Sequence, residues 1–481
     1  MRHDRGTRMS AIGTELQSTV MGNIAAIRNQ GEGASKHNLS WVMVFGYFIV
    51  LFIGDLLSGL ELVPQTAPDQ VALALQLLLL VVAAAESSRV ARRFVMPGAT
   101  PVLSLVAISI ASAVVNGQGA VQTVIFIRAV LGQYVLLLVL VNIRFSLHEF
   151  KRLNKAIFTL CAIQIPVAFF RLLSSGADVF LAGGSRSFGT EGAAGTFGRA
   201  GGSIGTTFPL VVIGFLFAFY LWKAKKIYIL WMIGFIFFSF TTGKRAFPFA
   251  LPAFLFGLYI LIHERGKALS RKVLILGSLG VLGFIGGIFL HPSLNPSEKV
   301  GGIVQFRYAF EKALAYEQSM TWEGNTAGRF LTSKHLVELS AERGISAFLL
   351  GNGPATLIKS GLIDSNYHEN LAAMGIAYGL TGGGWLFAQI GFLGLLSFLW
   401  LVLSFFRQSM RIRARIPDPY WKAVCGGLIG LHVVILYDTL AYSTTCVAGK
   451  VLPALWFLFL AQILFRRDIR SQVLQSKPSA S

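Results

Sequence analysis

The sequence predicts an all-α polytopic membrane protein with about twelve transmembrane helices and one large polar loop. Hydrophobic residues make up 54% of the 481 residues and charged residues only 13%, about half the charged fraction of an ordinary soluble domain. Many windows of about 20 residues carry no charge, and this length is enough to cross the hydrocarbon core of a bilayer. Composition and run length therefore exclude a soluble globular enzyme.

The apolar runs place the expected spans, in chain order, at 39–60, 69–86, 99–116, 119–141, 156–174, 206–222, 227–242, 246–263, 273–290, 384–406, 422–437 and 447–465. These spans define a polar N-terminal tail (1–38), a first block of nine helices (39–290), a large loop (291–383), a second block of three helices (384–465) and a C-terminal tail (466–481). The first 38 residues hold no small-residue cleavage site after a short apolar core, which argues against a removable signal peptide.

The distribution of positive charge predicts the orientation. With twelve spans, 28 of the 42 lysines and arginines fall in the two tails and in the short loops on the same side as the tails. Short loops rich in Lys and Arg remain in the cytoplasm, so both termini are expected to be cytoplasmic and the large loop periplasmic. The net charge of +20 then reflects orientation and affinity for anionic membrane lipids, and no nucleic-acid partner is expected.

Two arginines interrupt the expected spans. Arg128 lies inside the run 119–141, and Arg171 lies near the outer end of the run 156–174. An ionised guanidinium costs a few kcal/mol inside a membrane, so each is expected to face a polar cavity or a partner and is a candidate for substrate binding. The alternatives are a structural hydrogen bond for Arg128 and, for Arg171, a side chain that extends to the outer headgroups.

The outward loop at 175–205 is rich in glycine and carries Arg186 and Arg199. Glycines let a backbone approach a ligand closely and expose its N–H groups, and the arginines add charge. This pattern predicts an anion-binding surface. The competing interpretation is a flexible connector.

Lys244 and Arg245 follow Gly243 in a short turn at the expected outer surface. The pattern lacks the spacing of a P-loop. Two cations in an outward turn oppose the orientation rule, and Arg suits bidentate binding of phosphate. The turn is therefore the strongest candidate for a phosphate site.

Within the large loop, the spacing of apolar residues predicts two amphipathic helices. Val304, Tyr308, Ala309 and Leu314 would form the apolar face of the first, and Phe330, Leu336, Val337 and Leu339 that of the second. Arg329 would stand at the start of the second helix, capped by Asn325 or Thr326, where an arginine beside a helix N-terminus can bind an anion. The alternative is an ordinary salt bridge, for example to Glu323.

A polar segment from Asp364 to Asn370 follows the second helix and supplies His368, Glu369 and Asp364 as candidates for a general base. His368 is the residue we assign to this role. The competing interpretation is a solvated loop histidine.

Three of these segments together resemble the bacterial O-antigen ligase and polymerase family. The matching residues are the turn Gly243-Lys244-Arg245, Arg329 ahead of the turn Gly351-Asn352-Gly353, and Gly391-Phe392-Leu393-Gly394 at the opening of a span. One position departs from the ligase pattern. In ligases of the family, a His-Asn-type pair lies eleven residues before the glycine that corresponds to Gly391. In this chain that position is Leu380. The departure favours a polymerase of O-antigen, exopolysaccharide or capsule over a ligase.

The resemblance implies an undecaprenyl-diphosphate-linked oligosaccharide as donor, at the outer face of the bacterial inner membrane. It implies Arg245 and Arg329 as catalytic residues, and Lys244, Gly351 and Gly353 as substrate-binding residues. His368 lies twelve residues before the position of the family's histidine and is assigned as the general base from its polar segment alone. No cofactor is expected, and no metal, because the outward loops hold no Asp-x-Asp motif. A chain-length regulator would be a further partner. The alternatives are an O-antigen ligase, a lipid or saccharide transporter, and a structural assembly subunit, although the chain lacks the internal repeats usual in transporters.

The topology can be tested with reporter fusions. Fusions at Gly301 and Gly351 should report the periplasm, and fusions at Lys226 and Arg413 the cytoplasm, because the positive charge is concentrated beside the latter two. Paired alkaline phosphatase and fluorescent protein fusions measure this directly. A cytoplasmic signal at Gly351 would contradict the orientation.

Overall fold

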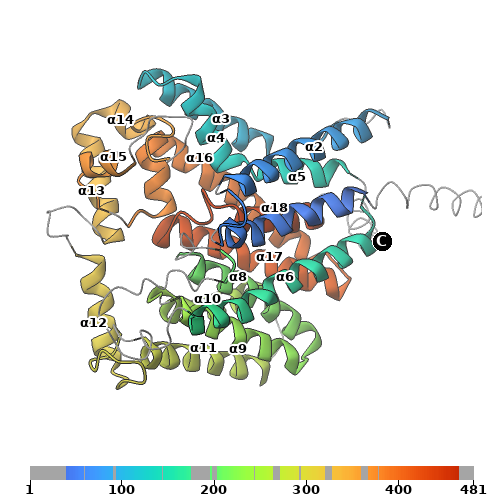
Figure 1. The fold of residues 1–481 in the computed structure, drawn as a ribbon, viewed down its shortest axis with the longest axis vertical. Coiled ribbons are helices and arrows are strands. Elements are labelled where there is room, and N and C mark those ends of the chain that lie inside the picture. The colour runs from blue at the N-terminus through green and yellow to red at the C-terminus, as the bar shows by residue number, and fades with distance from the viewer. Residues whose placement is uncertain are drawn as a thin grey trace, which may run out of the picture.

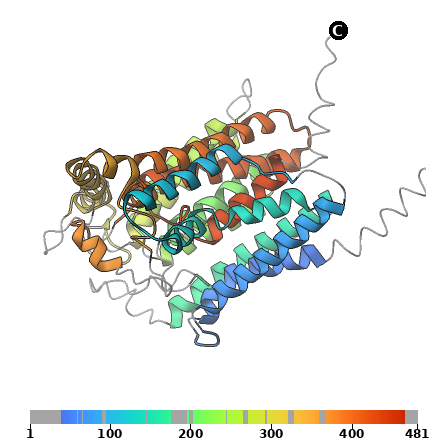
Figure 2. The same ribbon diagram turned by 90° about the horizontal axis from the view of Figure 1, so that it is seen from above.

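The computed structural model is a bundle of α-helices, with four short helices gathered at one end (Figures 1 and 2). It describes residues 39–58, 60–64, 66–89, 94–143, 145–174, 195–197, 203–242, 244–263, 271–291, 294–319, 328–358, 367–377 and 379–464. The predicted tails 1–38 and 466–481 lie outside these residues.

The described chain begins with the helix Leu39–Ser58. Then follow α2 (Ala67–Arg89), α3 (Ala99–Val115), α4 (Ala120–Leu131), α5 (Tyr134–Asn142), α6 (Leu147–Ser174), α8 (Ile204–Lys223), α9 (Lys226–Thr241), α10 (Ala246–Ile262) and α11 (Arg271–Leu290). The short helices are α12 (Phe306–Glu317), α13 (Arg329–Glu342), α14 (Ile345–Leu350) and α15 (Tyr367–Ala373). The chain returns through α16 (Gly382–Arg413), α17 (Pro419–Tyr437), the π-helix η4 (Asp438–Tyr442) and α18 (Val451–Leu464).

Each predicted span coincides with one apolar helix, except 119–141, which coincides with the pair α4 and α5; the helices differ in length. Six are long and apolar enough to cross a membrane, namely Leu39–Ser58, α2, α6, α8, α16 and α17 with η4. The bent pair α4 and α5 would make a seventh, while α3, α9, α10, α18 and the apolar part of α11 are shorter. The all-α class is confirmed for the described residues, with six helices that are candidate membrane spans. The count of twelve spans and the periplasmic position of residues 291–383 stay predictions.

Three helices, α8, α17 and α18, form the centre of the bundle. Residues Ile204–Tyr220 of α8 and all residues of α18 are buried on every side, as expected for helices that are apolar around their whole circumference. Gly427 of α17 faces the ring of Phe215 in α8, where a side chain would collide. Gly426 and Gly430 lie on either side of it along α17. Small residues at this spacing let helix backbones approach closely in a membrane.

The predicted span 119–141 is broken. α4 and α5 meet at an angle of 62° around Gly132 and Gln133. Gln76 of α2 donates hydrogen bonds to the Gly132 carbonyl (3.2 Å) and to the Tyr47 hydroxyl (2.6 Å), and Tyr47 donates to Gln133. The break corrects the position of Arg128, which lies in the last turn of α4 and is exposed. A cation at a helix C-terminus is favoured by the helix dipole.

A second break lies inside α16, where Ile390 and Gly391 leave the helical conformation. Residues Gly351–Gly353 dock onto this break. The amides of Asn352 and Gly353 donate to the carbonyls of Ala388 (3.0 Å) and Gln389 (2.9 Å). Ser112 of α3 donates to the Leu350 carbonyl at 2.5 Å from the other side. Two glycine motifs that are separate in the sequence therefore form one contact.

The two predicted loop helices are present, and the predicted apolar faces are confirmed in part. Ala309 of α12 and Leu336 of α13 are buried, and Val304 and Leu339 pack against the buried clusters. The exceptions are Leu314, Phe330 and Val337, which are 61%, 70% and 46% exposed. In α12, Phe306 and Phe310 add ring contacts with Phe284 of α11. In α13, Thr332 and Ser340 are buried on either side of Leu336 at four-residue spacing.

The docked turn predicts a large loss of stability for Gly351→Ala. Gly351 has a φ of +73°, and a Cβ there would lie 2.5 Å from the Gln389 carbonyl carbon. The backbone strain of about 1–2 kcal/mol would add to an overpacking cost of about 1–3 kcal/mol. Thermal unfolding followed by fluorescence-detected size exclusion measures the effect.

Gly117→Ala is the matched control for this variant. Gly117 has a φ of +63°, but a Cβ at this position would have nothing within 4 Å, so the variant should show the strain cost alone. Equal unfolding temperatures for the two variants would show that the docked turn is not tightly packed against α16.

Candidate functional site

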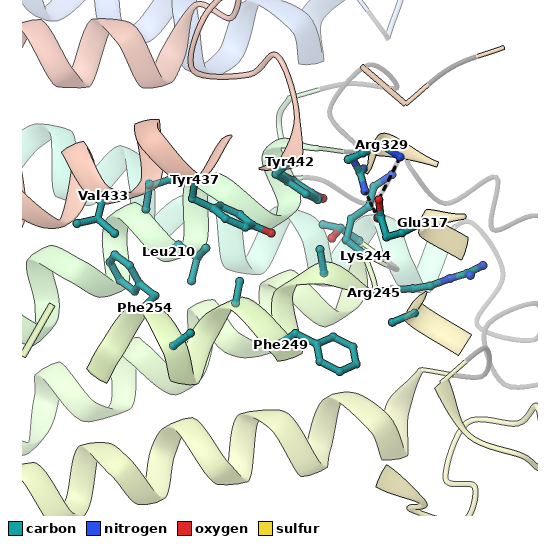
Figure 3. Close-up of a pocket in the computed structure, with 16 residues that line it drawn as sticks. Leu210, Lys244, Arg245, Phe249, Phe254, Glu317, Arg329, Val433, Tyr437 and Tyr442 are labelled. Carbon is teal, nitrogen blue, oxygen red and sulfur yellow. Dashed lines mark hydrogen bonds and ion pairs between the residues drawn. The ribbon is translucent and has the colours of Figure 1, made fainter. Parts of the chain in front are cut away.

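One cavity brings together cations that the sequence separates widely. It has a volume of about 680 Å³ and lies among α8, α10 and α17, with α12 and α13 at its mouth (Figure 3). Its described lining includes three cationic side chains, those of Lys244, Arg245 and Arg329, and one carboxylate, that of Glu317. The rest of the lining is largely apolar and aromatic. The cavity therefore has the character of an amphipathic site for an anion.

The turn between α9 and α10 supplies two of the cations. Arg245 is the N-cap residue of α10, and Ala246 at the start of the helix also lines the cavity. The α10 N-terminus adds the positive end of a helix dipole to the charges of Lys244 and Arg245. Lys244 is half-buried and Arg245 is exposed. Arg245 can therefore reach a ligand that enters from outside the bundle.

The third cation, Arg329, is held in place by Glu317 and Tyr442. Glu317 at the end of α12 accepts hydrogen bonds from the Arg329 amide (3.0 Å) and the Phe330 amide (3.4 Å), and its other oxygen lies 3.4 Å from the guanidinium. The guanidinium carbon of Arg329 lies 4.6 Å from the centre of the Tyr442 ring, a cation–π contact. Its Nε is buried and has no hydrogen-bond partner among the described residues.

This arrangement corrects the expected helix cap and identifies the ion-pair partner of Arg329. The N-cap of α13 is Gly328, which makes no side-chain cap bond, so the capping role assigned to Asn325 or Thr326 belongs to the Glu317 carboxylate. The salt bridge is formed with Glu317; the suggested partner, Glu323, lies outside the described residues. Arg329 is also more enclosed than a loop arginine, with 20% of its side chain exposed.

Two stacked tyrosines form one wall of the cavity, and a π-helix aligns them. The rings of Tyr437 and Tyr442 are 5.4 Å apart with an interplanar angle of 10°. In an α-helix, residues five apart face different directions. They face the same direction in a π-helix, where the amide of residue i+5 donates to the carbonyl of residue i. The Ser443 amide donates to the Asp438 carbonyl in this way (3.0 Å). The Asp438 carboxylate fixes the end of this turn by accepting from Ser443 Oγ (2.5 Å) and the Cys446 amide (2.6 Å).

The inner part of the cavity is apolar. Figure 3 shows Phe254, Leu210 and Val433 at the end opposite Arg329 and Arg245, with the two tyrosines between them. Phe249 and Phe254 come from the same face of α10 as Ala250 and Ala253. The cavity thus leads from a cationic mouth to an apolar interior. Such a gradient matches a ligand with an anionic head and an apolar tail.

The other predicted site residues lie elsewhere. Arg171 is half-buried in the last turn of α6, and neither it nor Arg128 lines the cavity. Gly351 and Gly353 contact the α16 break and the side chain of Gln118, so packing accounts for their conformations. Arg186 and Arg199 lie outside the described residues, as does the side chain of His368, whose backbone belongs to α15.

The sequence interpretation missed three lining residues, Glu317, Tyr437 and Tyr442. Glu317 falls at the end of an amphipathic helix, where an exposed carboxylate is ordinary. The tyrosines fall at the end of an apolar run, and the only local signal was the neighbouring Asp438, an acidic residue in a membrane-like segment, which marks a functional region.

Comparison with known proteins adds no family assignment, because no family model and no curated protein matches the chain. The chemistry of the cavity is therefore the basis for assigning a function.

The position of Glu317 predicts that removing its carboxylate loosens the start of α13. In Glu317→Ala the amides of Arg329 and Phe330 lose their acceptor, a cost of about 1 kcal/mol, comparable to the loss of a helix cap. Hydrogen exchange at these amides should become faster by about fivefold. Glu311→Ala is the control, because Glu311 pairs with Arg307 on the exposed side of α12. Equal exchange at Arg329 and Phe330 in both variants would contradict the capping role.

Proposed function

We propose that the protein is a polysaccharide polymerase that transfers glycan repeat units from an undecaprenyl diphosphate carrier, at the outer face of the bacterial inner membrane. The observation that carries the proposal is the joint cavity of Lys244, Arg245 and Arg329, which opens into an apolar interior. A diphosphate beside the three cations and a polyprenyl chain along Phe249 and Phe254 would fill both parts.

The reaction follows from these groups. The hydroxyl oxygen of an acceptor sugar attacks the anomeric carbon of the donor, and the bond from that carbon to the diphosphate oxygen breaks. The electron pair goes to the diphosphate, where Lys244, Arg245 and Arg329 stabilise the growing negative charge. Arg329 also has an unsatisfied donor, its buried Nε. The side-chain cations supply the positive charge that the leaving group needs, so the reaction would need no divalent metal.

Glu317 is the group we propose as acceptor of the hydroxyl proton. It is the carboxylate among the described lining residues, and hydrogen bonds to the α13 amides orient it. A base must lie within hydrogen-bond reach of the proton that it removes, and Glu317 is next to the cations that would hold the diphosphate. His368, the residue assigned to this role from the sequence, has its side chain outside the described residues.

Arg245→Gln tests the proposed diphosphate site. The variant keeps hydrogen bonding but loses the charge, and charge-assisted hydrogen bonds contribute about 1.5–3 kcal/mol. Binding of undecaprenyl diphosphate to the purified protein should weaken by about 10- to 100-fold. In cells lipid-linked single repeat units should accumulate, while the amount of protein in the membrane stays normal because Arg245 is exposed.

Arg307→Gln is the matched control for this test. Arg307 is an arginine of α12 that pairs with Glu311, has 86% of its side chain exposed and does not line the cavity. It should bind and polymerise like the wild type. Wild-type chain lengths in Arg245→Gln would remove the arginine from the site.

A reconstituted assay separates polymerisation from transport. Purified wild-type protein in liposomes should convert lipid-linked repeat units to longer glycans in the presence of EDTA. Movement of these lipids across the bilayer without elongation would identify a transporter, and transfer to a lipid A acceptor would identify a ligase.

A further inference from the structure

A second cavity, distinct from the site of the three cations, lies between α6, α8 and α9. Its volume is about 670 Å³ and its lining is mostly apolar and aromatic. Ile163, Ile227 and Trp231 line it and are 42%, 47% and 38% exposed, so the groove opens to the surface of the bundle. In a membrane protein such a surface faces lipid.

Three lysines gather at one end of this groove. Lys151 and Lys155 lie four residues apart in the first turns of α6, and therefore on one face, and Lys223 is the last residue of α8. Lys151 Nζ lies 5.0 Å from the centre of the Tyr420 ring, and Lys223 Nζ lies 4.3 Å from that of Trp222. Both rings also line the groove. The cations are thus placed against aromatic walls at the polar end of an apolar channel.

A hydroxyl group adds a polar contact at the same end. Tyr420 Oη accepts a hydrogen bond from Asn154 (3.2 Å), which is itself paired with Gln462 on both amide atoms. Asn154 is 1% exposed, so this pair fixes the position of the tyrosine. The phenolic hydrogen then points to a partner other than Asn154.

The lysine end lies at the opposite end of the bundle from Lys244 and Arg245. α9 begins at Lys226, three residues after Lys223, and ends at Thr241, three residues before Lys244. Its 16 residues span about 24 Å at 1.5 Å per residue, close to the thickness of a bilayer core. The two cationic sites therefore flank the two ends of α9, as expected for sites at opposite surfaces of one membrane.

The length of the groove fits one lipid leaflet. From Lys151 to Pro166 the lining residues of α6 cover about 22 Å, against about 15 Å for the hydrocarbon of one leaflet, half of the core. The remaining length accommodates a headgroup beside the lysines.

We propose that this groove is a specific site for a phospholipid with an anionic headgroup, such as phosphatidylglycerol, in the leaflet opposite the diphosphate site. The phosphate contacts Lys151, Lys155 and Lys223, and an acyl chain lies along Phe158, Ile163 and Trp231. Charge complementarity identifies the occupant, because a zwitterionic lipid offers these lysines no net charge. The inference does not depend on the polymerase reaction.

Native mass spectrometry of the full-length protein in detergent tests the site. Dioleoyl-phosphatidylglycerol should bind more tightly than dioleoyl-phosphatidylcholine, whose acyl chains are identical. Each lysine near a charged surface contributes a factor of about five. Lys155→Gln should therefore reduce the preference about fivefold, and the triple variant Lys151→Gln, Lys155→Gln, Lys223→Gln should abolish it. Glycerol 3-phosphate, the headgroup without chains, should not compete.

Lys225→Gln is the matched control. Lys225 is an exposed lysine in the turn beside the groove and does not line it, so the preference should stay at the wild-type value. A triple variant that retains the preference, or a Lys225→Gln variant that loses it to the same extent as Lys155→Gln, would overturn the site in favour of general attraction to positive charge. Competition by glycerol 3-phosphate would overturn the lipid as occupant.

Discussion

A membrane helix that is interrupted must find new partners for the backbone groups that the interruption releases, because lipid offers none. This constraint governs the region around α16. The non-helical residues Ile390 and Gly391 remove the carbonyls of Ala388 and Gln389 from the normal helical ladder. The amides of Asn352 and Gly353 replace the lost donors. The broken helix α16 and the turn Gly351–Gly353 therefore stabilise each other.

The same contact fixes the position of the cationic site. The turn closes α14, and α14 follows α13 directly, so one end of this helical pair is attached to α16. Arg343 at the end of α13 adds a hydrogen bond to the Asn352 side chain at 2.8 Å. The other end of α13 is held by Glu317 through its first two amides. With both ends fixed, Arg329 is directed toward Tyr442, across the cavity from the α10 turn.

The sequence predicts the helices of this protein better than their interactions. Run length and charge locate every apolar helix, because these properties depend on local composition. The breaks at Gly132 and Gly391 depend on partners distant in the chain, Gln76 and Asn352, and no local pattern reveals such a partner. Of the cavity residues, Arg245 was predicted because a cation in a short outward turn is unusual, and Arg329 because it stands at the start of a predicted helix. Glu317 was missed because an acidic residue in a polar segment is common. The family resemblance and the function that it implies remain a hypothesis that the structure accommodates.

The π-helix between α17 and α18 has a consequence for how this chain tolerates change in length. A π-turn holds one residue more than the α-turn that would replace it. Conversion of this turn to an ordinary α-turn at constant chain length would rotate Tyr442 by about 100° relative to Tyr437, and the Arg329 guanidinium would lose its aromatic support. Deletion of one residue between the two tyrosines would instead leave them four residues apart, a spacing that shares one face of an α-helix. The wall of the cavity thus depends on the match between residue number and helix type, and a relative with one residue fewer in an ordinary helix here would still place the two tyrosines on one face.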